Sequence, residues 1–300
     1  MLRGRRIVAY ADLMNVQDTP IGIFDSGLGG LSVALEVRRR LPAERLLYAA
    51  DSRFCPYGTR TPEEIRWRSL LVAEALAERG AKLLIVACNT ATAYALEALR
   101  ATFSIPIIGM EPAVKPAVEL SRNGRIGVLA TPRTASSERL RLLIERYAAT
   151  QDVRPVPAPG LVELVETGAT DPAVARSAVA PLLEPLLRDG VDTLVLGCTH
   201  YPFLRTAIAA VAGEGITLVD SGDAIARRAS ALLDLHDAHA RHGHPGGLEL
   251  LTTGDVDQVG AVAARLLAEI VTVSHLPLPE TPAIEPAHPA MCAGSVPAGA

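Results

Sequence analysis

The sequence has few aromatic residues, few cysteines and no excess of positive charge. Phe, Trp and Tyr make up 4% of the 300 residues, and the formal net charge is −4 at pH 7. A basic surface is the usual sign of a protein that binds nucleic acid, so the charge argues against nucleic acid as a partner. The arginine run at residues 38–40 ends a predicted helix, where cations complement the helix dipole.

Long apolar runs are also absent. No run reaches the roughly 18 residues that a membrane span requires. Three arginines precede a weak apolar stretch at residues 7–14, but Asp12 interrupts it, which makes a poor signal peptide. We therefore predict a cytoplasmic protein with no membrane partner, in which thiols stay reduced.

The chain has four cysteines and no C-x-x-C spacing, so it fits neither a disulfide framework nor a zinc site. They are Cys55, Cys88, Cys198 and Cys292. Four histidines, at positions 236, 239, 242 and 244, lie close together. With no second cluster to complement them, we interpret them as a solvated helix end and expect no metal.

The two ends of the chain lack the pattern of the middle. Residues 1–19 precede the first clear strand and are predicted to be an N-terminal extension. Met14 is an alternative start that would leave residues 1–13 untranslated. Residues 276–300 are rich in Pro, Ala and Gly and are predicted to be a disordered tail, so Cys292 is given no role.

Between these ends, short apolar runs alternate with longer helical patterns, which predicts an α/β fold. The strands are nearly continuous apolar runs, as in parallel sheets that helices cover on both faces. The predicted strands are 20–24, 46–50, 83–87, 106–109, 125–130, 153–156, 193–197, 216–219 and 248–252. The predicted helices are 28–41, 62–79, 91–102, 112–122, 133–149, 172–189, 202–212, 222–241 and 256–269.

A faint internal repeat relates two parts of the chain. Residues 21–25 resemble residues 126–130, and residues 82–90 resemble residues 192–200. Two similar α/β halves would place equivalent strand ends opposite each other across a cleft. Ligands of open α/β sheets bind beyond the carboxyl ends of the strands, so the polar residues at these ends are the candidate site.

A glycine-rich turn, residues 25–30, joins the first predicted strand to a helix. Its free N–H groups would bind an anion such as a carboxylate. Two alternatives remain open. Gly27-x-Gly29-x-x-Ser32 carries two of the three glycines of a dinucleotide fingerprint, and Asp51 would then meet a ribose. Asp25 would otherwise act only as a helix cap.

The loop after the second predicted strand contains Pro56-Tyr57-Gly58, which would present a phenol and free N–H groups to a ligand. Pro and Gly mark any turn, so this signal is weak alone. Cys55 precedes the proline and is interpreted as non-catalytic. The following residues 66–68 (Arg-Trp-Arg) are interpreted as ordinary positions on the next helix.

Cys88 and Cys198 each follow a buried strand and precede hydrogen-bonding side chains and a helix. One such cysteine alone is more often a small apolar core residue. A matched pair at equivalent places in two halves is harder to explain as core packing. In addition, a helix N-terminus lowers the pKa of a thiol, which makes the thiolate accessible at neutral pH. Two thiols facing each other could remove a proton from one face of a carbon and deliver one to the opposite face.

Four motifs in order resemble the glutamate racemases of the aspartate/glutamate racemase superfamily, from about residue 20 to residue 275. The motifs are residues 25–31, 50–58, 87–91 and 197–202. The resemblance implies interconversion of L- and D-glutamate without pyridoxal phosphate or a metal. It also implies a homodimer whose D-glutamate supplies peptidoglycan synthesis.

The resemblance further implies individual roles. Cys88 would act on the D-glutamate side with Asp25 beside it, and Cys198 on the L-glutamate side with His200 near it. Glu166 would be a further acidic residue on that side, with Glu163 as its competitor because Ala158 departs from the family pattern. The residues implied to hold the substrate are Asp25, Ser26, Tyr57, Gly58, Asn89, Thr90, Thr199 and His200.

The resemblance also implies that one lobe is inserted in the other. Residues 20–112 plus 213–275 would form the first α/β lobe and residues 113–212 the second, with the two lobes facing each other across a cleft. Two other functions remain open: a racemase for another acid such as aspartate, and a two-lobed binding protein without catalytic activity.

Overall fold

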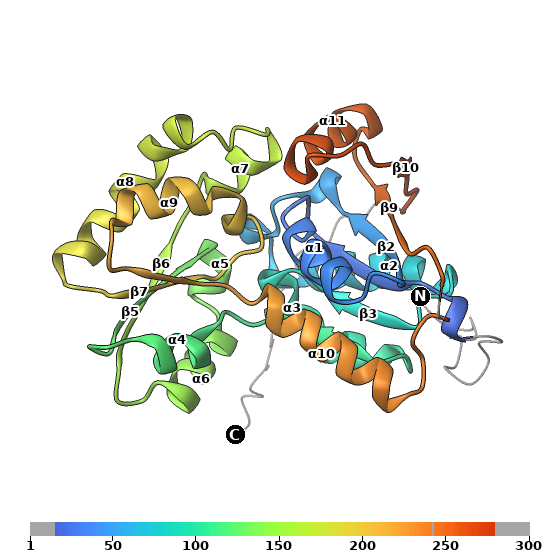
Figure 1. Cartoon of the computed structure of the whole chain (residues 1–300), viewed down its shortest axis with the longest axis horizontal. Helices are drawn as coiled ribbons and strands as arrows, with labels where there is room; N and C mark the ends of the chain where they lie inside the picture. Colours follow the sequence, from blue (N-terminus) through green and yellow to red (C-terminus); the bar gives the residue numbers. More distant parts are fainter. Residues whose placement is uncertain (1–15, 242, 280–300) are drawn as a thin grey trace, which may run out of the picture.

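The computed structural model describes residues 16–241 and 243–279, which form two parallel sheets flanked by helices (Figure 1). The six-stranded sheet has the order β10-β9-β2-β1-β3-β4, and the four-stranded sheet has the order β6-β5-β7-β8. We call the six-stranded sheet with its helices the first lobe and the four-stranded sheet with its helices the second lobe. The predicted fold of two parallel-sheet α/β lobes is confirmed.

The elements of each lobe are as follows. The first lobe contains β1 (Ile21–Asp25), α1 (Leu31–Arg40), β2 (Arg45–Ala50), α2 (Pro62–Glu78), β3 (Leu83–Val86), α3 (Asn89–Thr102), β4 (Ile107–Gly109), α10 (Gly222–Leu235), β9 (Gly247–Thr252), α11 (Val256–Leu267) and β10 (Val273–His275). The second contains α4 (Val114–Leu120), β5 (Arg125–Ala130), α5 (Pro132–Ala135), α6 (Glu138–Tyr147), β6 (Asp152–Pro157), α7 (Leu161–Glu166), α8 (Pro172–Arg188), β7 (Thr193–Leu196), α9 (Arg205–Ala212) and β8 (Thr217–Val219). Short 3₁₀ turns are η2 (Val16–Asp18), η3 (Ser52–Phe54), η4 (Tyr57–Thr59) and η5 (Tyr201–Leu204).

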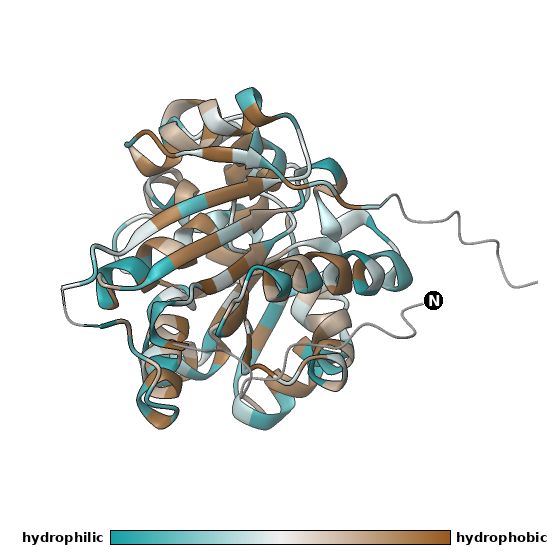
Figure 2. Cartoon of the chain, turned by 90° about the vertical axis from the view of Figure 1, so that its right-hand side faces the viewer, coloured by the Kyte–Doolittle hydropathy of each residue, from teal (hydrophilic) through white to brown (hydrophobic). Residues whose placement is uncertain are grey.

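Each sheet has an apolar core on both of its faces. In β1, Ile21 and Ile23 pack with residues of α1 and α10, whereas Phe24 packs on the other face with residues of α2 and α3. This follows from the alternation of side chains along a strand. The helices carry brown and teal residues together in Figure 2, as expected for helices with one packed and one solvated face. The arrangement leaves the strand ends, rather than the faces, open to a ligand.

Helix starts are fixed by local side chains. Thr61 and Glu64 form a capping box at the start of α2, with Pro62 in its first turn. Ser137 accepts a hydrogen bond from the Leu140 N–H and thereby starts α6. The single helix predicted at residues 133–149 is therefore wrong, because a second cap divides it into α5 and α6.

Two predicted boundaries are also corrected. Strand β8 pairs with β7 in the second lobe, so the chain returns to the first lobe after Val219 rather than at residue 213. Residues 276–279 are not a disordered tail: the Leu276 N–H donates to the Thr252 carbonyl at 2.7 Å, and Leu276 is buried. They follow β10, a three-residue strand that the sequence pattern did not predict.

Other predictions fall on residues that the structure does not describe. Residues 1–15 with Met14, His242, and residues 280–300 with Cys292 lie outside the described part of the chain. Across residues 16–241 and 243–279, no helix combines the length and the apolar character that crossing a bilayer would require.

Candidate active site

One buried pocket lies where strand ends of the two lobes meet. It is lined by Cys88, which follows β3, and by Cys198, which lies shortly after β7. Both thiols are almost fully buried. The other predicted substrate-holding residues also line it: Asp25, Ser26, Tyr57, Gly58, Asn89, Thr90, Thr199 and His200. The structure therefore brings together residues that were widely separated in the sequence.

Cys88 is held by the start of α3. Its Sγ accepts a hydrogen bond from the Ala91 N–H at 3.4 Å, which makes the cysteine the N-cap of that helix. Its thiol also lies 4.0 Å from Ser26 Oγ. Burial, and next the negative charge of Asp25, raise the pKa of Cys88 well above its ordinary value. Both effects therefore favour the protonated form of the Cys88 thiol.

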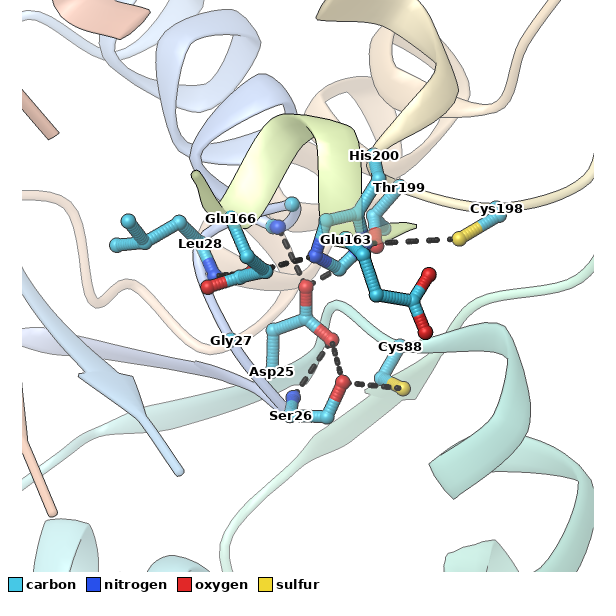
Figure 3. Close-up of polar contacts among 12 residues, drawn as sticks. Asp25, Ser26, Gly27, Leu28, Cys88, Glu163, Glu166, Cys198, Thr199 and His200 are labelled. Atoms are coloured by element: carbon cyan, nitrogen blue, oxygen red, sulfur yellow. Dashed lines mark hydrogen bonds and ion pairs between the residues drawn. The ribbon is translucent and has the colours of Figure 1, made fainter. Parts of the chain in front are cut away.

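Asp25 ends β1 and connects the two lobes. One carboxylate oxygen accepts from the Ser26 N–H at 2.6 Å, and the other accepts from the Gly30 N–H at 2.6 Å and from Thr199 Oγ1 at 3.0 Å (Figure 3). Complete burial raises the pKa of Asp25 above its ordinary value. Asp25 thus fixes both the glycine-rich turn and the loop after β7.

Two N–H groups of the glycine-rich turn, those of Leu28 and Gly30, are not free to bind an anion as the sequence suggested. The Gly30 N–H is taken by Asp25, and the Leu28 N–H donates to Glu166 Oε1 at 2.6 Å. The glycines are required for close approach: a Cβ at Gly29 would lie 2.2 Å from His200 Nδ1. Two carboxylates of the chain itself therefore take the place of the expected ligand.

Cys198 belongs to a hydrogen-bond network with His200 and Glu166. Its Sγ lies 3.5 Å from His200 Nδ1, and His200 Nε2 lies 2.6 Å from Glu166 Oε1 (Figure 3). Glu166 ends α7, a six-residue helix that the sequence pattern did not predict. Glu163 is exposed and points away from this pair, so Glu166 is the carboxylate that contacts His200.

The charges of His200 and Glu166 in this network follow from their contacts. Burial lowers the pKa of His200, but hydrogen bonds with Cys198 and its other partners outweigh burial and leave that pKa well above its ordinary value. Burial raises the pKa of Glu166, but the contacts with His200 outweigh it and leave that pKa lowered. The contacts between the two groups therefore favour their charged forms, an imidazolium at His200 and a carboxylate at Glu166.

Two expectations, about Asp51 and about Arg68, are wrong. Asp51 does not face a ligand, because it is fully buried and pairs with Arg68 at 2.6 Å, which removes the support for a ribose contact. Arg68 is accordingly a buried partner rather than an ordinary helix position. The Tyr57 hydroxyl donates to Asp51 Oδ2 at 2.6 Å, so the phenol is used inside the protein although Tyr57 lines the pocket.

Several pocket residues were missed from the sequence. Thr131 and Thr134, after β5, line the pocket, and their hydroxyls lie 3.0 Å from that of Thr90. The internal repeat could have indicated them, because it matches the end of β5 with the end of β1. Both polar side-chain atoms of Asn89 are buried and without a hydrogen-bond partner within the described residues, so they are available to a ligand.

Cys55 is the third cysteine near the site. It lies beside Glu166 and His200, outside the pocket that holds the other two thiols. Burial raises the pKa of Cys55 to about 12. Its position could not be read from the sequence, since Glu166 and His200 come from distant segments.

The fold and the site define a two-lobed α/β enzyme of the amino-acid racemase class, in which two strand-end thiols share one pocket. The chain belongs to the Asp/Glu/Hydantoin racemase family, whose sequence profile matches residues 31–229. It is 49% identical over 240 residues to the glutamate racemase of Herpetosiphon aurantiacus, covering 80% of this chain and 94% of that one.

Solved structures agree with this assignment. A glutamate racemase of Bacillus anthracis superposes with a TM-score of 0.81 at 35% identity, over 88% of this chain and 100% of that one. The Escherichia coli glutamate racemase, solved in complex with L-glutamate and the activator UDP-MurNAc-Ala, superposes with a TM-score of 0.78 at 36% identity. That match covers 87% of this chain and 100% of the other.

Proposed function

We propose that this chain is a glutamate racemase in which Cys88 and Cys198 act on opposite faces of the substrate Cα without a cofactor. The observation that carries the proposal is the shared pocket: both buried thiols line it from equivalent strand ends of the two lobes. The family relatives named above support glutamate as the substrate. No observation specifically favours a binding protein without activity.

Each thiol has a defined part in the proposed reaction. Starting from L-glutamate, the Cys198 thiolate removes the Cα proton, and the electron pair of the C–H bond moves into the carboxylate. The Cys88 thiol then donates its proton to the opposite face of Cα, which gives D-glutamate and leaves a Cys88 thiolate. The raised pKa of Cys88 supports this assignment, since it keeps a proton on the thiol for delivery. The reverse reaction exchanges the two roles.

The surrounding groups stabilise the negative charge that develops on the substrate when the Cα proton is removed. The carbanion-like transition state needs hydrogen-bond donors fixed around the substrate carboxylate. Asn89 offers an amide that has no hydrogen-bond partner among the described residues, and Thr90 contributes a hydroxyl. Asp25 and Ser26 lie on the Cys88 side, whereas His200 and Glu166 position the Cys198 side. Tyr57 and Gly58 form a wall of the pocket.

We extend the proposal to the setting of the enzyme. It acts as a homodimer in a bacterial cytoplasm, and its D-glutamate supplies peptidoglycan synthesis. The first lobe comprises residues 20–112 and the segment that returns after β8, and the second lobe lies between them. In this arrangement the substrate binds in the pocket between the two lobes.

A substrate panel tests the proposed function. The purified chain, treated to remove pyridoxal phosphate and metals, is incubated with each enantiomer of glutamate and aspartate, and circular dichroism follows loss of optical activity. We expect both glutamate enantiomers to racemise, and aspartate to react more slowly by at least about tenfold, because one missing methylene misplaces the distal carboxylate. Faster turnover of aspartate, or activity only with pyridoxal phosphate, would contradict the proposal.

A further inference from the structure

Three side chains with metal-binding atoms meet beside the racemase pocket. Cys55 Sγ, a carboxylate oxygen of Glu166 and a ring nitrogen of His200 all lie within 4.8 Å of one another. They come from the loop between η3 and η4, from the end of α7, and from the residue before η5. No sequence spacing could reveal such a group, because its members come from three separate segments.

We propose that Cys55, Glu166 and His200 form a binding site for one Zn²⁺ ion. Thiolate, imidazole and carboxylate are the side chains that zinc prefers, whereas hard cations such as Mg²⁺ prefer oxygen ligands alone. Zinc bonds of about 2.0–2.3 Å place the ligand atoms of a tetrahedral site roughly 3.3–3.6 Å apart. The ligand atoms now lie within 4.8 Å of one another, and His200 Nε2 and Glu166 Oε1 are 2.6 Å apart. Zinc binding would therefore move the imidazole and the carboxylate apart, and the Cys55 thiol would lose its proton to solvent as the S–Zn bond forms.

The site has a route to solvent and room for a fourth ligand. A cavity of about 250 Å³ adjoins the racemase pocket and is lined by both Cys55 and Glu166. Leu28, Glu163 and Gln258 complete much of its wall. A metal ion could enter from this cavity and keep a water molecule in its fourth position, as zinc sites with three protein ligands do.

The backbone around the site supports its geometry. The Leu28 N–H donates to Glu166 Oε1 at 2.6 Å, which orients the carboxylate. A Cβ at Gly27 would lie 2.2 Å from that oxygen and 2.8 Å from Cys55 Sγ, so only glycine lets these two groups come together. His200 contacts Glu166 through Nε2, which is the nitrogen we assign to the metal, while Nδ1 faces Cys198.

Zinc at this site would inhibit racemisation. The ion would replace the hydrogen bond between Glu166 and His200 and hold the imidazole through Nε2, so the ring could no longer adjust its position beside Cys198 Sγ during the reaction. This consequence rests on the proposed function, whereas metal binding itself does not.

Cobalt substitution tests binding without reference to activity. Co²⁺ replaces Zn²⁺ in such sites, and a thiolate ligand gives a charge-transfer band in the near ultraviolet. We expect the band in the unaltered protein, in Glu163→Gln and in the double variant Cys88→Ser/Cys198→Ser, and its loss when Zn²⁺ is added. We expect no band in Cys55→Ser. A band that persists in Cys55→Ser, or disappears in the double variant, would overturn the proposal by assigning the metal to the pocket thiols.

A zinc titration of racemase activity tests the consequence. Activity of the unaltered protein should fall with Zn²⁺ and return with a chelator, and Cys55→Ser should require at least about 100-fold more Zn²⁺ for half inhibition. Each variant is compared with its own metal-free rate. Equal sensitivity of the two proteins would overturn the inhibitory role. If the chain proved not to racemise glutamate, the cobalt spectra would still decide whether the site binds metal.

Discussion

Replacing Cys88 or Cys198 with serine is expected to lower kcat/KM for glutamate by roughly 10²–10⁴-fold in both directions. A serine hydroxyl has a similar size but is a far weaker acid than a thiol, so it cannot exchange a proton with Cα at neutral pH. Both directions suffer because each thiol acts once in every turnover, as the base in one direction and the acid in the other. Circular dichroism of each glutamate enantiomer measures the loss.

Cys55→Ser is the matched control for these two variants. It removes a half-buried thiol beside Glu166 and His200 but none from the pocket that the other two cysteines share. It should change metal-free kcat/KM much less than either pocket variant. Glutamate binding to Cys88→Ser, measured by calorimetry, should remain detectable. Full activity in either pocket variant would contradict the assigned roles of the thiols.

Replacing Arg68 with methionine is expected to lower the free energy of unfolding by about 3–5 kcal/mol, because it leaves the Asp51 carboxylate buried without its cation. Arg68 donates to both oxygens of Asp51, at 2.9 and 2.6 Å, and to the Pro279 carbonyl at 3.0 Å. Its guanidinium also lies 3.8 Å from the centre of the Phe54 ring. Urea unfolding followed by tryptophan fluorescence and circular dichroism measures the loss.

The neighbouring Arg66 provides the control for this prediction. It is exposed on the same helix, so Arg66→Met should change the free energy of unfolding by no more than about 0.5 kcal/mol. The double variant Arg68→Met/Asp51→Asn should recover part of the lost stability, since the uncompensated charge is gone. Equal stability of the two single variants would show that the buried pair does not support the fold.

The sequence could predict the parts of the site that follow strands. Cys88, Cys198 and Asp25 lie at the ends of apolar runs, and apolar runs are read reliably when helices cover both faces of a sheet. The faint repeat also indicated that the two cysteines occupy equivalent places. Their shared pocket, however, depends on how the lobes dock, and no local pattern carries that information.

The remaining parts depend on contacts between distant residues. The α7 helix that brings Glu166 to His200 spans six residues, too few for a clear helical period. Arg68 resembles an exposed helix arginine until Asp51 is placed against it. The glycine-rich turn was correctly located, but the carboxylates that occupy its N–H groups, from Asp25 and Glu166, become apparent only in three dimensions.

The central claim is that two thiols act on opposite faces of one carbon, and isotope incorporation at low conversion tests it most directly. L-Glutamate is incubated with the enzyme in D₂O, and both enantiomers are separated and analysed by mass spectrometry; the experiment is then repeated from D-glutamate. Two bases predict deuterium at Cα of the newly formed enantiomer and none in the recovered starting enantiomer, since the delivering thiol has exchanged with solvent. Protium retained in the product, or deuterium entering the starting enantiomer at the same rate, would indicate a single base and contradict the account.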